Sequence, residues 1–256
     1  MRDTVQQELY GRLIGDSAPY NLRFGDGIAS TTATVIAAAA GIRDIPRLSA
    51  ADAAKIKRLH LLLAFYNAFQ PGVFALSGWD LVGALTVPGA AVKDRLADGD
   101  TRWINRGAYD LIGSNPEAKT ADSGLPVAVA LYGPLPRQLG SPDSFASRLA
   151  HMLKVRADLR LYAGRLIDAP AVRAKGLFVL VNQLPDTQDI EVTAINFGSE
   201  RVEETVAIHG CVPDSVATEV LGVHPSRQRV GPGGALQVGL GSYEYAAFRL
   251  RGSSGQ

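Results

Sequence analysis

The sequence has little cysteine and no concentration of charge, and each shortage excludes a class of protein. The single cysteine, Cys211, cannot form a disulfide within the chain, and a structural zinc site would need several Cys or His ligands at short spacing. Charged residues make up 20% of the 256 residues, the formal net charge is +1, and no long run of one sign occurs. We therefore expect no nucleic-acid partner, no metal site and no other cofactor.

Long apolar runs are also missing. The N-terminal segment MRDTVQQELYGRL has mixed charges and lacks the apolar centre of a signal peptide. No segment approaches the roughly 18 uninterrupted apolar residues that a membrane span requires. We expect a cytoplasmic protein without a membrane partner, and the lone cysteine fits a reducing compartment.

The first quarter of the sequence is rich in alanine and helical in character. Residues 27–40 read GIASTTATVIAAAA, with Ser30 and Thr31 as candidate N-caps and Gly41 at the end. This pattern predicts a helix packed closely enough to need small side chains.

A second helix is predicted from Ser49 to about Asn67. Ser49 and Asp52 have the spacing of a capping box, in which each residue's side chain accepts a hydrogen bond from the other's backbone N–H. Leucine, isoleucine and phenylalanine then recur at helical intervals, with basic residues on the other side.

Pro71 and Gly72 end this helix, and a short apolar run, Val73 to Leu76, follows. A run this short, directly after a helix and apolar on both faces, predicts a buried strand of a parallel sheet. Residues 78–143 contain many glycines and prolines, which prevent long regular elements. This is too much irregular chain for a simple connection.

One more amphipathic helix is predicted after Ser141, and short strands between turn clusters follow from Gly176 onward. The predicted strand segments are GLFVLVN, IEVTAINF, VEETVAI, ATEVLG, ALQVGL and EYAAFRL. In the second segment, apolar residues alternate with Glu191 and Thr193, as expected for a strand with one face in water. The spacing predicts an antiparallel β-sandwich of about 85 residues.

Three longer stretches resemble the end of glycoside hydrolase family 13, the α-amylase family. LLLAFYNAFQPGVFALSGWDLVGAL at 61–85 resembles the eighth barrel strand and its flanks in trehalose synthase-like members. DGDTRWINRGAYDL at 98–111 and YGPLPRQLGSPDSFASRL at 132–149 are similar to segments that follow it. The resemblance implies an α/β plus all-β fold, with residues 1–164 as the C-terminal portion of a (β/α)8 barrel with long loops and residues 165–256 as the β-sandwich domain.

The resemblance implies retaining glucosyl transfer that interconverts maltose and trehalose. Such transfer needs two carboxylates on opposite sides of the glycosidic bond, one as nucleophile and one as acid and base. In the family a further Asp directly follows a His, but no histidine of this sequence is followed by Asp. The nucleophile motif Gly-x-Arg-x-Asp also has only near misses, Gly41-Arg43-Asp44 and Gly164-Arg165-Asp168.

A complete barrel needs about 250 residues, and only about 150 precede the sandwich. We therefore expect part of an enzyme, catalytically silent alone and holding no catalytic residue. A partial barrel leaves sheet edges unpaired, which favours pairing with another chain to complete the barrel.

Four residues are predicted to contact maltose, trehalose or a related α-glucoside in the complete enzyme. Trp79 and Asp80 follow the predicted barrel strand on the face that carries active sites, and a Trp offers a flat apolar surface to a sugar ring. Trp103 and Arg106 belong to a loop of mixed aromatic and polar character. The alternatives are that Trp79 packs the loop, that Asp80 caps a turn, and that an Arg–Asp pair holds the second loop.

Two other functions stay open. The sandwich could be the functional part of a stand-alone carbohydrate-binding or interaction module. It has few exposed-looking aromatics, mainly Tyr243 and Tyr245, and this argues against a surface on which sugars stack. The chain could also come from an amylase or a sucrose-acting member of the family. We interpret His60 as a half-buried, hydrogen-bonded histidine and not as a catalytic base.

Overall fold

The computed structural model describes residues 2–222 and 226–253. The chain forms two compact units: the first unit comprises Met1–His60 and Leu76–Arg148, and the second comprises Leu61–Ala75 and Leu149–Gln256. Helices α3 (Ala50–Ala68) and α6 (Phe145–Asp158) contribute residues to both units. The domain boundary predicted at residue 164 separates a barrel portion from a sandwich. This division differs from that of the two compact units, and it stays a prediction.

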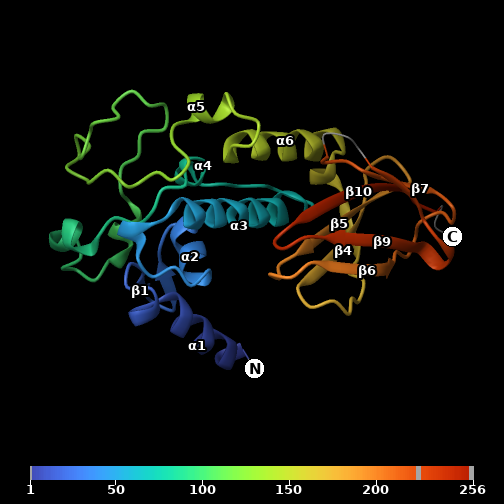
Figure 1. The fold of residues 1–256 in the computed structure, drawn as a ribbon, viewed down its shortest axis with the longest axis horizontal. Helices are drawn as coiled ribbons and strands as arrows, with labels where there is room; N and C mark the ends of the chain where they lie inside the picture. The colour runs from blue at the N-terminus through green and yellow to red at the C-terminus, as the bar shows by residue number, and fades with distance from the viewer. Residues whose placement is uncertain (1, 223–225, 254–256) are drawn as a thin grey trace. The chain divides into compact units, whose positions relative to one another are not determined.

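The regular elements of the first unit are mostly helices, and the unit is coloured blue to green in Figure 1. Its regular elements, apart from short 3-10 turns, are α1 (Arg2–Leu13), β1 (Leu22–Phe24), β2 (Gly27–Ala29), α2 (Thr32–Ala39), the first part of α3 (Ala50–Ala68), α4 (Gly78–Val82), α5 (Leu135–Leu139) and the start of α6 (Phe145–Asp158). The β1–β2 hairpin was not predicted, because each of its strands has only three residues.

Helices α2 and α3 begin where their capping signals predict. Thr31 Oγ1 accepts a hydrogen bond from the Thr34 backbone N–H at 3.3 Å, whereas the Ser30 hydroxyl bonds elsewhere. At the start of α3, Ser49 Oγ accepts from the Asp52 N–H at 3.1 Å and Asp52 Oδ2 accepts from the Ser49 N–H at 3.1 Å. The capping box is therefore confirmed, and a local sequence pattern sets the position of α3.

The predicted parallel strand at Val73–Leu76 is wrong. These residues are not assigned to any strand, and the Val73 side chain is 97% exposed. The described residues form no closed barrel, and the strand pairs of their sheets are antiparallel. A barrel strand forms backbone hydrogen bonds with a neighbouring strand on each side. Among the described residues, no strand pairs with Val73–Leu76.

The second unit contains the predicted antiparallel sandwich, and all six predicted segments are strands. One sheet has the order β3 (Arg165–Asp168), β4 (Leu177–Gln183), β5 (Asp189–Asn196), β10 (Tyr245–Arg251), β7 (Val216–Glu219), β8 (Arg227–Arg229). The other pairs β6 (Val202–Ala207) with β9 (Ala235–Leu240).

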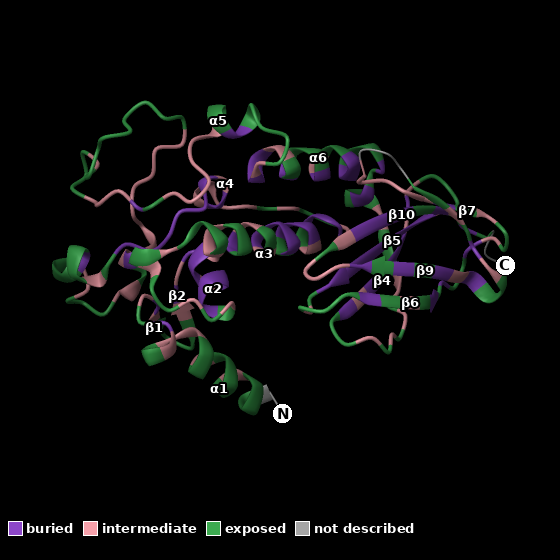
Figure 2. Ribbon diagram, viewed as in Figure 1, coloured by how far each residue is buried: buried purple, intermediate pink, exposed green. Residues whose placement is uncertain are grey.

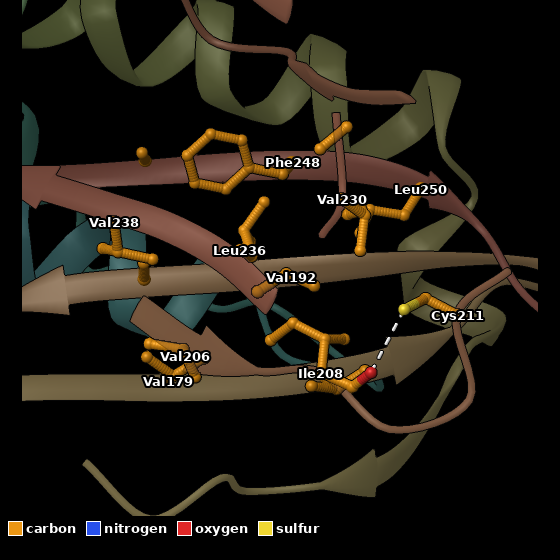
Figure 3. Packing of buried hydrophobic residues seen from close by; sticks show 14 of the residues in the cluster. Val179, Val192, Val206, Ile208, Cys211, Val230, Leu236, Val238, Phe248 and Leu250 are labelled. Carbon is orange, nitrogen blue, oxygen red and sulfur yellow. Dashed lines mark hydrogen bonds between the residues drawn. The ribbon is translucent and has the colours of Figure 1, made fainter. Parts of the chain in front are cut away.

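The core of the sandwich lies between the two sheets, as Figure 3 shows. Val192 and Phe248 of the larger sheet face Val206 and Leu236 of the smaller one. Cys211 closes one end of this core, where its thiol donates to the Ile208 carbonyl at 3.1 Å and where burial raises the pKa of that thiol.

The second face of β5 is buried, which corrects the expectation of a strand with one wet face. Glu191 and Thr193 are both 0% exposed, and β5 is coloured as buried along almost its whole length in Figure 2. Residues at the end of α3 cover this face: Thr193 Oγ1 donates to the Phe69 carbonyl at 3.3 Å, and Tyr245 stacks on Phe65 with ring centroids 4.4 Å apart. Tyr245 is therefore no open platform for a sugar.

Candidate functional site

The loop after Leu76 enters the short helix α4, which carries Trp79 and Asp80. Asp80 Oδ2 accepts a hydrogen bond from the Ser77 backbone N–H at 3.2 Å, so this carboxylate caps the first turn. Asp80 is 5% exposed, and its Oδ1 has no hydrogen-bond partner among the described residues. One oxygen thus shapes the loop while the other faces the interior.

Asp80 belongs to a buried polar cluster with His60 and Tyr132. The distance from Asp80 Oδ1 to His60 Nε2 is 3.5 Å, and the distance from His60 Nδ1 to the Tyr132 hydroxyl is 3.0 Å. Burial, and then the negative charge of Asp80, hold the pKa of Tyr132 well above its usual range. His60 is 1% exposed, so it is fully buried and not half-buried as interpreted from the sequence.

Sequence reasoning missed the role of Tyr132 because no local pattern links it to its partners. His60 lies on α3, Asp80 on α4 and Tyr132 on the loop before α5, and 72 positions separate His60 from Tyr132. The cluster ties these three segments together in the first unit. A buried carboxylate and imidazole at this distance need only a small movement to form a hydrogen bond.

Gly83 fixes where the Tyr132 ring lies. Its φ of +62° is left-handed, and a Cβ added there would lie 2.6 Å from the Tyr132 ring. We expect Gly83→Ala to lower the free energy of unfolding of the first unit by about 2 kcal/mol or more. Chemical denaturation measures this, with Gly41→Ala as the control, because Gly41 also has a left-handed φ, of +75°, and a Cβ there meets nothing within 4 Å. A loss equal to that of Gly41→Ala would contradict the assignment.

Trp79 is partly buried and packs against a hydrophobic cluster of the first unit. The buried members of this cluster are Ala29, Val82, Ala84, Val87, Val92, Ile104 and Ala128. Its indole Nε1 is buried and has no hydrogen-bond partner among the described residues. An unpaired buried donor costs free energy, so a ligand or solvent acceptor at this atom would be favourable.

Trp103 packs against the same cluster and is held by two arginines. The guanidinium carbons of Arg95 and Arg106 lie 4.9 Å and 4.5 Å from the centroid of its ring. Arg106 Nη2 also lies 3.3 Å from Asp100 Oδ2. The Arg–Asp pair considered as an alternative is therefore present, and it gives Arg106 a role in the shape of the loop.

Asp100 is the centre of this loop. Its carboxylate accepts two hydrogen bonds from the Arg102 guanidinium, at 2.8 Å and 3.0 Å. These bonds, chiefly, lower the pKa of Asp100 to about 2. The structure thus brings Trp79 and Trp103 to one hydrophobic cluster, whereas Asp80 turns toward His60 and Arg106 toward Asp100. Sugar contact by any of the four stays a prediction.

The described residues contain no group of three His, Cys, Asp or Glu side chains that could hold a metal ion. Within the same residues, no helix is both long and apolar enough to cross a bilayer.

No protein-family model matches the sequence, and no curated protein matches it closely. Solved structures do. A mutant of the trehalulose synthase MutB in complex with Tris has a TM-score of 0.53 at 15% sequence identity, covering 75% of this chain and 38% of that chain. A mutant isomaltulose synthase from Erwinia rhapontici NX5, bound to its natural substrate sucrose, has a TM-score of 0.50 at 14% identity, covering 76% and 38%. Three quarters of this chain therefore share a fold with part of these enzymes, and the chain spans well under half of their length.

Proposed function

We propose that this chain is the C-terminal part of an α-amylase-family enzyme that transfers a glucosyl unit. The observation that carries the proposal is the fold shared over 75% of the chain with a trehalulose synthase. The sequence of the stretch at 61–85 resembles the end of a family 13 barrel and its loop and adds support, although Val73–Leu76 within it forms no strand in this structure. Trehalose synthase is our first candidate for the activity, with maltose and trehalose as the sugars.

A sucrose-acting enzyme is the second candidate. Its support is that the isomaltulose synthase with the shared fold is described with sucrose as its natural substrate. The two candidates place the same kind of sugar, an α-linked disaccharide, beside the loop that carries Trp79. They differ in which disaccharide binds.

The chemistry of both candidates needs carboxylates that we propose are absent from this chain. Asp80, the predicted site carboxylate, caps α4 and faces His60, so it is engaged as a structural group. We expect the purified chain to form no trehalose, glucose or isomaltulose from maltose or sucrose above the level in buffer. Product analysis by chromatography tests this, and clear turnover would overturn the claim that the reactive acids are missing.

Tryptophan fluorescence tests the sugar-side role of the Trp79 loop. The chain has two tryptophans, so each can be removed in turn. We expect maltose or sucrose to change the fluorescence of the wild-type chain and of Trp103→Phe, and to leave that of Trp79→Phe unchanged, because a sugar that contacts the Trp79 indole alters its surroundings. A response carried only by Trp103, or no response to either sugar, would contradict this role.

A further inference from the structure

A separate hollow of about 560 Å³ lies in the first unit, between α3, α5 and the start of α6. This volume falls within the roughly 300–1,000 Å³ that small-molecule sites occupy. One wall is a face of α3 where Ala50, Ala53 and Ala54 follow one another at helical spacing. Their short side chains leave the space open, and Lys57 continues the same face one turn later.

The opposite wall is held rigidly by Gln138. This side chain is 3% exposed, and its Nε2 donates to the Leu81 carbonyl at 2.7 Å and the Gly133 carbonyl at 2.8 Å. Its Oε1 accepts from the Ala146 backbone N–H at 3.0 Å. Gln138 thereby joins α4, α5 and α6 in one arrangement, so the hollow is formed before any ligand arrives and binding requires little ordering.

The floor of the hollow is aromatic. The rings of Tyr132 and Phe145 stack with centroids 4.9 Å apart and an interplanar angle of 20°. The Tyr132 hydroxyl is held by His60 Nδ1, which fixes the orientation of the ring. Phe145 is 0% exposed and the two rings cover one another, so the apolar surface that the hollow offers to the C–H faces of a pyranose comes chiefly from the alanine methyl groups.

The rim carries hydrogen-bonding groups of both kinds. Lys57 Nζ donates one hydrogen bond to the Asp143 carbonyl at 3.2 Å, and its two other N–H groups can bond to a ligand. Arg137 and Ser141 offer further donors, and the exposed Asp143 carboxylate offers acceptors. The carboxylate opposes an anion, whereas hydroxyl groups can both accept from Lys57 and Arg137 and donate to Asp143.

We propose that this hollow is a second sugar site, which binds a neutral mono- or disaccharide of the α-glucoside class apart from the Trp79 loop. The proposal rests on the proposed function for the class of sugar. Neither tryptophan lines the hollow, so its occupancy can be separated from events at Trp79.

The test is calorimetric titration of the full chain with maltose, and with inorganic phosphate as the anionic probe. Ala54→Phe fills the hollow from the exposed surface of α3, and we expect it to weaken maltose binding by about tenfold or more. Ala51→Phe places the same side chain at an exposed position of the same helix outside the hollow, and it should bind like wild type. Arg137→Ala, an exposed substitution, should also weaken binding.

Three results would overturn the proposal. The first is that maltose does not bind at this site, and the second is that phosphate binds in place of maltose. The third is that Ala54→Phe and Ala51→Phe bind maltose equally well while Arg137→Ala binds it like wild type. The fluorescence experiment fails or succeeds independently, because Trp79→Phe should leave the calorimetric signal of the hollow intact. Circular dichroism confirms that each variant is folded before it is titrated.

Discussion

Replacing Glu191 with glutamine is expected to remove most of the fall in stability that the second unit shows as pH rises from about 4.5 to about 8. Glu191 is fully buried, and burial raises its pKa from 4.5 to about 8, against the opposing hydrogen bonds from Asn182 and Thr193. The Asn182 Nδ2 donor lies 2.8 Å and the Thr193 hydroxyl 2.7 Å from its oxygens.

Among the residues that the structure describes, none forms an ion pair with Glu191. Arg249 is its directly paired residue on β10, but the Arg249 guanidinium is exposed and bonds to Asp189 at 2.8 Å. When Glu191 is protonated, its carboxyl O–H can donate a hydrogen bond. Asn182 Oδ1 can accept it, because this oxygen is buried and has no partner among the described residues. The carboxylate has no such donor, so the interior favours the protonated form.

The direction of the pH dependence follows from these two pKa values. Between about pH 4.5 and pH 8 the folded chain keeps a proton on Glu191 that the unfolded chain has lost, so stability falls as pH rises. The contribution is complete below pH 4.5 and is lost once the pH passes about 8. A shift of this size corresponds to a few kcal/mol, on the order of 1.4 kcal/mol for each pH unit.

Hydrogen exchange of the β4 and β5 amides at several pH values measures this in the second unit alone. For Glu191→Gln, the protection of these amides, after correction for intrinsic exchange, should change little with pH. At pH 8 it should exceed the protection in the wild-type chain. Glu203→Gln is the matched control, because Glu203 is exposed and pairs with Arg201 on the surface, so it should behave as wild type. A wild-type profile that is flat or rises over the window contradicts the expected sign.

Local signals predicted α2, α3, α6 and six strands of the sandwich, but not α1 or the β1–β2 hairpin. The Ser49–Asp52 capping box gives the start of α3, and the alternation at Ile190, Val192 and Ala194 gives the core face of β5. These patterns depend on neighbours within a few residues, which the sequence displays directly.

Long-range partners were beyond the sequence. In the sequence, Glu191 and Thr193 indicate a strand face exposed to water. In the structure, residues at the end of α3 cover this face, which the local pattern does not show. The run at Val73–Leu76 looks like a barrel strand, yet a strand is defined by partners that the run itself does not specify. At the site, the position of Asp80 after that run singled it out, whereas nothing near it in the sequence indicated its pairing with His60.

Arg156→Met is expected to lower the free energy of unfolding of the second unit by roughly 3–5 kcal/mol. Arg156 is 6% exposed, and its burial lowers the pKa of the guanidinium. Its Nη1 donates to the carbonyls of Ala68 at 2.7 Å and Gln70 at 2.8 Å, and its Nη2 donates to that of Gly72.

These carbonyls lie where α3 ends, at the last helical residue and just beyond it, so no intrahelical donor reaches them. A cation there also interacts favourably with the partial negative charge at a helix C-terminus. Methionine preserves the length and apolar stem of the side chain but leaves the three carbonyls without this donor, and that of the buried Ala68 is the most costly to leave unpaired. The loss should therefore exceed what packing alone explains.

Denaturation of Arg156→Met, Arg156→Lys and wild type separates charge from geometry. Lysine keeps the charge but lacks the planar fork that reaches three carbonyls, so its loss should be intermediate. Lys154→Ala, which removes an exposed pair with Asp158 on the same helix, should change stability by less than about 0.5 kcal/mol. If Arg156→Met matched Lys154→Ala, the turn after α3 would be held by packing and not by Arg156.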